Sequence, residues 1–213
     1  MRLTHSGNLP MYCVNNKYIL WFRLLLLCPL LAGCKTDLQN LPAFSDQKQL
    51  QVVILTPAGS NQPQIYHPEK KEFHPALVAG QPAKVNFLPF PGNFGFIPST
   101  AYQPADSAAA GELLTALVLS ESQPAGTVQE VIPIATVMLD VAGEKTPVVI
   151  GVPARPSQRI ITATDFTEFS QNYPAAKEIL QKWLPYAKPH QKVKFLGWQD
   201  EKETEKFIRR WLK

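Results

Sequence analysis

The side chains that could act as nucleophiles or metal ligands are scattered along this 213-residue chain. A serine nucleophile needs a histidine and an acid in a fixed arrangement, and metal-binding histidines usually lie a few residues apart. Neither pattern surrounds the candidates, which are Ser99, Ser107 and Ser120 among the serines and His67, His74 and His190 among the histidines. We therefore predict no serine nucleophile, and we expect the histidines to be surface or hydrogen-bonded residues.

Three acids in the middle of the chain are a second group of candidates. Asp140 and Glu144 flank Gly143 between two apolar runs, and Glu112 stands apart from them. Carboxylates hold Mg²⁺ in proteins, but a single carboxylate does not make a Mg²⁺ site. The residue types alone therefore favour an acidic turn at Gly143 and a solvated or loop position for Glu112.

Residues 1–33 have the pattern of a secretion signal. An apolar run of about ten residues follows a positive flank and is too short to span a bilayer comfortably. It ends in Leu31-Ala32-Gly33-Cys34, which resembles the lipobox of bacterial lipoproteins, where the signal is cut before the cysteine and the cysteine is lipidated. An uncleaved anchor and a buried apolar helix are the alternatives, and Met11 rivals Met1 as the true start.

Cysteine usage favours lipidation of Cys34. Cys13 and Cys28 lie inside the expected signal, so Cys34 is the only cysteine of the mature chain. One cysteine cannot form an internal disulfide, and an exposed free thiol is a liability in an exported protein. The resemblance implies more than one acyl chain and thus a stable anchor. We predict an exported, membrane-anchored lipoprotein of the bacterial cell envelope, with a signal at 1–33, a polar tether at 34–48 and a domain at 49–213.

The charge balance argues against a nucleic-acid partner. The chain carries 21 Lys and Arg against 17 Asp and Glu, a net charge of +4. Three of the basic residues, Arg2, Lys17 and Arg23, belong to the signal, which contains no acid. The remainder is close to neutral and lacks the basic surface that polyanions require.

The composition predicts one domain built mainly from strands, because 45% of the residues are hydrophobic and twenty prolines work against a helical bundle. Near-continuous apolar runs at 50–56, 113–119, 128–139 and 148–152 are typical of buried strands. Shorter strands are expected at 64–67, 73–78 and 193–196.

Helical patterns appear only late in the chain. A short helix follows Asp165 or Thr164, and longer ones are expected at 175–184 and at 201–212, the last with Asp200 as its N-cap. Strands first and helices later predict an α+β fold, a closed or nearly closed antiparallel barrel with helices on its side.

An ordered series of motifs in the chain resembles those of a known protein family. The segment 90–98, FPGNFGFIP, resembles the F/Y-P-x-N-Y-G-F/Y-I-P motif of soluble family I inorganic pyrophosphatases. Further matches follow in order from Val52 to Trp198, including QPAG at 123–126, AGE at 142–144 and KVKFLGW at 192–198. The resemblance covers 49–213, and it implies an OB-like five-stranded barrel with flanking helices and Mg²⁺-dependent hydrolysis of pyrophosphate.

Most polar site positions of that family carry other residues here. The acidic motif D-G-D-P-x-D falls on 110–115, where Glu112 is the one acid kept and Ala110, Leu113 and Thr115 replace polar or motif residues. A first-strand acid falls on Leu55, and two phosphate-facing tyrosines fall on Phe90 and Phe94.

The second half of the family pattern is kept in part. Asp140 and Glu144 match its second acidic cluster, but Lys145 replaces the next acid, and the motif's lysine falls on Pro147 or Val148. No arginine lies between Arg23 and Arg155, so the family's phosphate-binding arginine is absent, with Lys84 the nearest substitute. Tyr186 matches a late tyrosine, and Lys188 follows it two positions on.

Two hypotheses follow. The first is a lipid-anchored, catalytically impaired pyrophosphatase-like protein with no cofactor, which binds a protein or a small molecule. The second is an active Mg²⁺-dependent diphosphatase with a rebuilt site made of Glu112, Asp140, Glu144, Tyr186 and Lys188, in which Glu112 and Asp140 are the metal candidates. Under either hypothesis the membrane is contacted through Cys34, nucleic acid is not a partner, and a homo-oligomer is compatible with the sequence.

Overall fold

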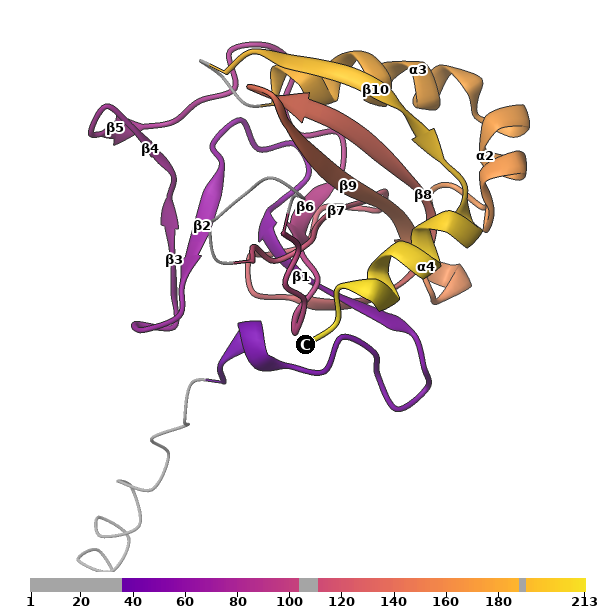
Figure 1. The fold of residues 1–213 in the computed structure, drawn as a ribbon, viewed down its shortest axis with the longest axis horizontal. Helices are drawn as coiled ribbons and strands as arrows, with labels where there is room; N and C mark the ends of the chain where they lie inside the picture. Colours follow the sequence, from indigo (N-terminus) through magenta and orange to yellow (C-terminus); the bar gives the residue numbers. More distant parts are fainter. Residues whose placement is uncertain (1–35, 104–110, 188–190) are drawn as a thin grey trace, which may run out of the picture. The chain divides into compact units, whose positions relative to one another are not determined.

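A computed structural model describes residues 36–103, 111–187 and 191–213 (Figure 1). Its centre is a ring of five strands in the order β1 (Leu50–Thr56), β6 (Asn93–Phe96), β7 (Thr115–Val118), β9 (Glu144–Pro153) and β8 (Val128–Val141). Pairing of β1 with β8 closes the ring. The α+β class and the OB-like barrel expected from the sequence are thus confirmed. One detail differs, because β7 and β9 pair in parallel while the other neighbours in the ring are antiparallel.

The long strand β8 serves two partners besides β9. Its first residues pair with β1, from Leu50 opposite Val131 to Val53 opposite Val128. Its second half pairs with β10 (Val193–Gln199), from Thr136 to Val141. The register of β8 against β9 shifts between Pro133 and Ala135, where proline cannot donate a ladder hydrogen bond. Pairing with β8 adds β10 as a sixth strand outside the closed ring.

The apolar runs form strands because both of their faces are buried. In β1, Val52 and Ile54 belong to one core cluster and Val53 to another, and all three are fully buried. Successive side chains of a strand point to opposite faces, so a continuous apolar run fits a barrel wall that is covered on both sides.

The helices lie late in the chain, as the sequence predicts. They are α2 (Phe166–Asn172), α3 (Pro174–Trp183) and α4 (Glu201–Arg210), with short 3₁₀ turns η2 (Leu38–Asn40), η3 (Pro156–Gln158) and η4 (Leu184–Tyr186). Asp165 caps α2, accepting from the backbone N–H of Glu168. Helices α2 and α3 lie together beside β10, while α4 crosses β8 (Figure 1).

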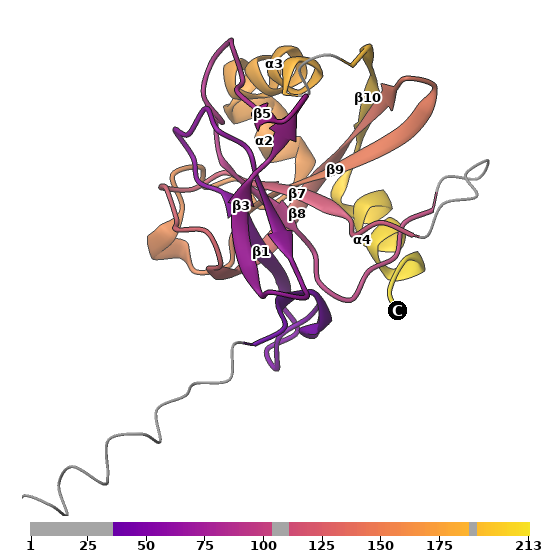
Figure 2. The ribbon, with the colours of Figure 1, turned by 90° about the vertical axis from the view of Figure 1, so that its left-hand side faces the viewer.

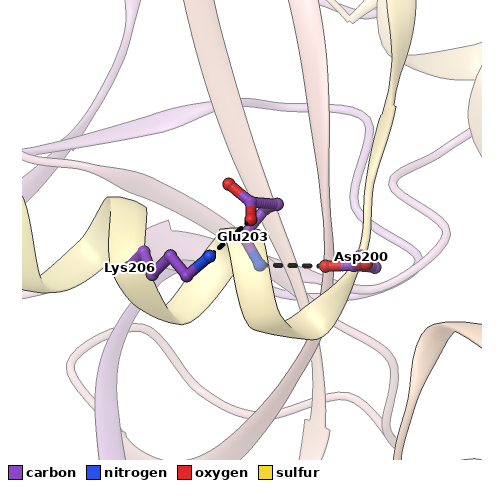
Figure 3. A network of polar contacts seen from close by, with 3 residues as sticks. All are labelled: Asp200, Glu203 and Lys206. Carbon is purple, nitrogen blue, oxygen red and sulfur yellow. Dashed lines mark hydrogen bonds and ion pairs between the residues drawn. The ribbon is translucent and has the colours of Figure 1, made fainter.

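The N-terminus of α4 is stabilised by side chains (Figure 3). The Asp200 carboxylate accepts a hydrogen bond from the backbone N–H of Glu203 at 2.9 Å, which satisfies one of the free donors of the first turn. The Glu203 carboxylate pairs in turn with the Lys206 ammonium at 2.7 Å. This hydrogen bond and the charge of Glu203 raise the pKa of Lys206. Ile208 of the same helix is buried in the barrel core.

Two small hairpins stand beside the barrel. They pair β2 (Gln64–His67) with β3 (Glu72–Pro75) and β4 (Leu77–Val78) with β5 (Gln81–Pro82). Figure 2 looks at this side of the molecule and shows β3 and β5 in front of the barrel. The hairpins and the chain that follows them are the part of the fold that borders the site described below.

The described chain begins shortly after Cys34, which lies with residues 1–33 outside the described residues. From Leu38 onward, the segment expected to be a tether contacts the domain: the Leu38 backbone N–H donates to the Tyr66 hydroxyl at 3.4 Å, and the Ser99 hydroxyl donates to the Leu41 carbonyl at 2.7 Å. Within the described part, no helix is long and apolar enough to cross a membrane.

Candidate functional site

A cavity of about 240 Å³ lies between the barrel wall and the first hairpin. The strands supply most of its walls, and η4 and its neighbours close one side. None of its lining residues carries a charge. They are Leu55, Thr56, Pro63, Gln64, Ile65, Ala76, Phe90, Phe94, Thr115, Leu139, Thr146, Val148, Leu184 and Ala187.

This cavity collects five of the positions that the resemblance assigns to polar side chains. Leu55 and Thr115 stand where acids are expected, Phe90 and Phe94 where tyrosines are expected, and Val148 at one of the two positions for the lysine. Each comes from a different strand or loop of the barrel. The fold therefore brings the matched positions together, and the residues present there make the cavity apolar.

A bulge places Leu55 at the cavity. Ile54 pairs with Gly95 and Thr56 with Phe94, so Leu55 is the extra residue of β1 at this point. A bulge re-aims the side chains of its strand, and here consecutive residues Leu55 and Thr56 both line the cavity. A leucine at this position contributes only apolar surface.

The threonines of the cavity are held in different ways. The Thr115 hydroxyl donates to the Pro147 carbonyl at 3.0 Å, and the Thr56 hydroxyl accepts from the Gln64 backbone N–H at 3.0 Å. Both hydroxyls therefore join neighbouring elements of the wall. Thr115, at the last acid position of the matched motif, acts as a link between β7 and β9.

The surviving acids lie elsewhere. Glu112, Asp140 and Glu144 are absent from the cavity lining. The Asp140 carboxylate accepts a hydrogen bond from the Gly143 backbone N–H at 2.7 Å. This bond spans the two-residue turn between β8 and β9, where Ala142 and Gly143 have φ values of 56° and 98°. The acidic stretch thus has the structure of a hairpin turn stabilised by its own aspartate.

Glu112 and Glu144 each interact with Tyr102, a residue that the sequence analysis missed. The backbones of Tyr102 and Glu112 exchange two hydrogen bonds, of 2.7 and 2.8 Å. The Tyr102 hydroxyl donates to the Lys145 carbonyl at 2.8 Å. Burial raises the pKa of Tyr102, and the negative charge of Glu144 raises it further. No pattern in the sequence marks this tyrosine, because its partners lie far along the chain.

Tyr186 does not line the cavity, although its neighbours in the chain Leu184 and Ala187 do. It is 64% exposed, and its ring packs on Phe87, itself 57% exposed, with centroids 5.4 Å apart. Phe90 and Phe96 are core residues, whereas Phe87 is a surface residue. Lys188, Ala110, Ser107 and His190 lie outside the described residues, so the lysine of the rebuilt-site hypothesis is not placed.

The described residues do not fit a Mg²⁺ site. Nowhere in 36–103, 111–187 and 191–213 do three His, Cys, Asp or Glu side chains gather as a metal site requires. The cavity offers hydroxyls and an amide but no carboxylate, while Mg²⁺ in proteins is held through carboxylates. No step of a metal-assisted reaction can be assigned to these residues.

Two histidines that the sequence analysis treated as scattered lie together on the first hairpin. Pairing of β2 with β3 places the rings of His67 and His74 5.1 Å apart, edge to face. The Nε2 atom of His74 lies 3.3 Å from a carboxylate oxygen of Glu72. Both histidines are partly exposed and neither lines the cavity.

A second hollow, of about 340 Å³, has polar walls. None of the candidate site residues lies in its lining, which is rich in glutamine and includes one arginine. The lining residues are Gln51, Gln123, Thr127, Val128, Gln129, Glu130, Arg155 and Gln158. The positions matched to the pyrophosphatase motif therefore point to the first cavity.

Comparisons with known proteins agree with the fold. A family model described as inorganic pyrophosphatase matches residues 52–213. The crystal structure of inorganic pyrophosphatase from Thermus thermophilus is 26% identical, with a TM-score of 0.62 over 82% of this chain and 95% of that chain. No curated protein matches the sequence significantly.

Two further solved structures share the fold at 14% identity. One is a type I inorganic pyrophosphatase from P. falciparum, with a TM-score of 0.70 over 83% of this chain and 61% of that chain. The other is an N-terminally truncated vacuolar soluble pyrophosphatase from Trypanosoma cruzi in complex with PPi, with a TM-score of 0.67 over 80% of this chain and 70% of that chain.

Proposed function

Because the chain belongs to the inorganic pyrophosphatase family, we propose that it keeps the family's barrel as a binding module and has lost hydrolysis of pyrophosphate. One observation carries this proposal. Five positions matched to the family's polar side chains, now Leu55, Phe90, Phe94, Thr115 and Val148, line a single cavity that has no charged side chain among the described residues.

The chemistry of pyrophosphate explains why such a cavity disfavours hydrolysis. The substrate is a polyanion, and transfer of an ion to an apolar site without a partner is very costly. Metal ions and cationic side chains normally supply the compensating charge and stabilise the developing charge in the transition state. Leu55, Phe94 and Val148 supply neither charge nor hydrogen bonds. A cavity with this lining favours uncharged ligands over phosphates.

The rival hypothesis is an active Mg²⁺-dependent diphosphatase with a rebuilt site. Its support is the family itself and the proximity of Glu112 and Glu144 to Tyr102. In that hypothesis Glu112 and Asp140 hold the metal, and Glu144, Tyr186 and Lys188 complete the site. The two hypotheses differ in one measurable quantity, the rate of phosphate release from pyrophosphate.

The test is a phosphate-release assay on the purified full-length protein with Mg²⁺ and pyrophosphate. We expect no release above a buffer blank. Turnover near the usual enzyme median of about 10 s⁻¹, abolished by Glu112→Gln or Asp140→Asn, would falsify the inactive proposal and establish the rebuilt site. Ile179→Glu is the matched control, because this residue is exposed on α3 and lies outside the cavity lining.

We also propose that the protein is exported and anchored in the cell envelope through a lipidated Cys34. The support is the Leu31-Ala32-Gly33-Cys34 sequence behind an apolar run, and the position of the other two cysteines within the expected signal. Metabolic labelling with a radioactive fatty acid tests this. Cys34→Ser should abolish labelling and membrane association, whereas Cys28→Ser should preserve both. Wild-type protein that is found unlabelled and cleaved elsewhere contradicts the proposal.

A further inference from the structure

We propose that the apolar cavity binds a neutral, mainly apolar small molecule of about ten non-hydrogen atoms, which carries one polar group hydrogen-bonded by Thr146 or Gln64. This inference rests on the proposed function, since it names the ligand class of the same site. It is carried by the size of the cavity, its lining and two unpaired polar groups in its wall.

The volume sets the size of the ligand. A dry cavity of roughly 150 Å³ accommodates benzene, which has six non-hydrogen atoms. The present cavity, of about 240 Å³, therefore accommodates a ligand larger by about half, such as a fused pair of rings or a short alkyl chain. Larger cofactors and dinucleotides are too big for it.

The lining sets the polarity of the ligand. Phe90, Leu139, Val148 and Leu184 also belong to a core cluster, so this wall is part of the packed interior and is formed before any ligand arrives. Ligand sites of this kind are mostly apolar, with a few polar groups that fix orientation. Because the described residues of the wall carry no charge, the carboxylate or phosphate of an anionic ligand has no partner among them.

Two polar side chains in the wall are available to a ligand. The Thr146 hydroxyl and the Gln64 carboxamide have no hydrogen-bond partner in the part of the chain that the structure describes. The other two hydroxyls of the wall, on Thr56 and Thr115, are already engaged. A ligand with a single hydroxyl, amide or carbonyl group can pair with either of the free side chains and place its apolar body against the aromatic rings.

Exposed apolar residues lie in or next to the lining of the cavity. Ile65, which lines it, is 41% exposed, and Leu77, next to the lining residue Ala76, is 62% exposed. The rings of Phe87 and Tyr186, tilted at 36° to each other, are exposed as well. Exposed apolar surface of this kind commonly accompanies a binding site.

The experiment uses two probes with the same ring system. Calorimetric titration of the full-length protein with 1-naphthol should show saturable binding of one molecule per chain. The charged analogue 1-naphthyl phosphate should bind at least tenfold more weakly, because no cation among the described residues lines the cavity. Tighter binding of the phosphate would mean that the site still selects phosphates, and it would overturn the proposal.

Variants locate the binding. Leu55→Glu places a charge in the cavity, and Ala76→Phe fills it; each should weaken 1-naphthol binding at least tenfold. The exposed control Ile179→Glu should leave binding unchanged. Unfolding curves of the variants show whether they are folded, and Ala76→Phe and Leu55→Glu perturb the cavity in independent ways. Binding that survives both substitutions in folded protein overturns the proposal.

The outcomes separate this inference from the proposed function. Phosphate release from pyrophosphate defeats the proposed function whatever the naphthol result. An inactive protein that does not bind 1-naphthol leaves the loss of hydrolysis intact and overturns the ligand class alone. A dimer that 1-naphthol dissociates identifies a second copy of the chain as the occupant and also overturns it.

Discussion

The side-chain amide of Asn93 donates a hydrogen bond to the hydroxyl of Ser120 over 2.9 Å, and both residues are buried. The same amide group donates to the Glu121 carbonyl at 2.8 Å. Its oxygen accepts from the backbone N–H groups of Ala58 and Gln123, at 3.0 and 2.8 Å. One asparagine of the aromatic motif thus joins the turn after β1 to the segment after β7, and its role in this fold is structural.

Removal of this side chain should destabilise the domain. Asn93→Ala removes the partner of the buried Ser120 hydroxyl and of three partly buried backbone groups, and we expect a loss of about 3 kcal/mol or more in the free energy of unfolding. Ser120→Ala removes one partner and should cost about 1 kcal/mol. Urea unfolding measures both. A cost of Asn93→Ala no larger than that of Ser120→Ala contradicts the structural role.

Gly95 of the same motif is required by close approach of two strands. A Cβ atom at this position would lie 2.0 Å from the Val53 carbonyl oxygen, a backbone atom that cannot move away. We expect Gly95→Ala to cost at least about 3 kcal/mol, or to yield no folded protein. In Gly143→Ala the new Cβ meets no atom within 4 Å, so only backbone strain of about 1–2 kcal/mol is expected. Similar stabilities of the two variants in urea unfolding argue against this explanation.

The buried tryptophan of the described core is Trp183. It is 1% exposed, its indole N–H donates to the Leu88 carbonyl at 2.8 Å, and its ring meets Phe90 edge to face at 4.9 Å. Trp183→Ala should cost about 3–5 kcal/mol. Trp198 is only half-buried, at the outer edge of the same cluster, so Trp198→Ala should cost about 1–2 kcal/mol. Chemical unfolding of both variants checks the order, and a larger cost at Trp198 reverses it.

The stability contributed by Tyr102 should fall at alkaline pH. Its pKa is raised above the ordinary value of 10.0, first by burial and then by Glu144. A group whose pKa is raised by folding stabilises the protein below its unfolded pKa, and that contribution is lost as the pH rises through the folded pKa. Tyr102→Phe should therefore cost about 1 kcal/mol at pH 8, through the lost hydrogen bond to Lys145. The cost should shrink above pH 10.

Urea unfolding at pH 8 and near pH 11 measures this trend. Tyr186→Phe is the control at pH 8, where a change within about 0.5 kcal/mol is expected, because this exposed hydroxyl has no hydrogen bond within the described chain. A cost of Tyr102→Phe that grows at high pH contradicts the assigned direction of the shift.

Local patterns in the sequence predicted the elements well. The bounds of β1 were predicted residue by residue, because a β-branched apolar run ends at the turn-forming residues after Thr56. Asp200 was identified as an N-cap and Asp165 as one of two candidates, since capping depends on neighbours three residues away. The parallel pairing of β7 with β9 could not be predicted in this way, because a run buried on both faces does not identify its neighbour.

The cavity could be identified only from the structure, for a similar reason. Leu55, Phe94 and Thr115 come from three strands, and only closure of the barrel brings them to one wall. Replacement of the matched polar residues was visible in the sequence, but the sequence did not reveal that their substitutes enclose an apolar space. The motif that ends at Trp198 was visible in the sequence, whereas burial of Trp183 depends on how α3 packs.

The two ends of β8 pair with different strands, β1 and β10, and we expect these two pairings to differ in how fast they form and open. Barrel closure pairs β1 with residues about 80 positions later, a long loop to close before any pairing energy is gained. We therefore expect slow, cooperative folding of the ring. Strand β10 pairs only with the outer half of β8 and takes no part in closure. Its amides can exchange with solvent by local opening while the ring stays shut, so hydrogen exchange should resolve an early-opening edge and a late-opening barrel within one domain.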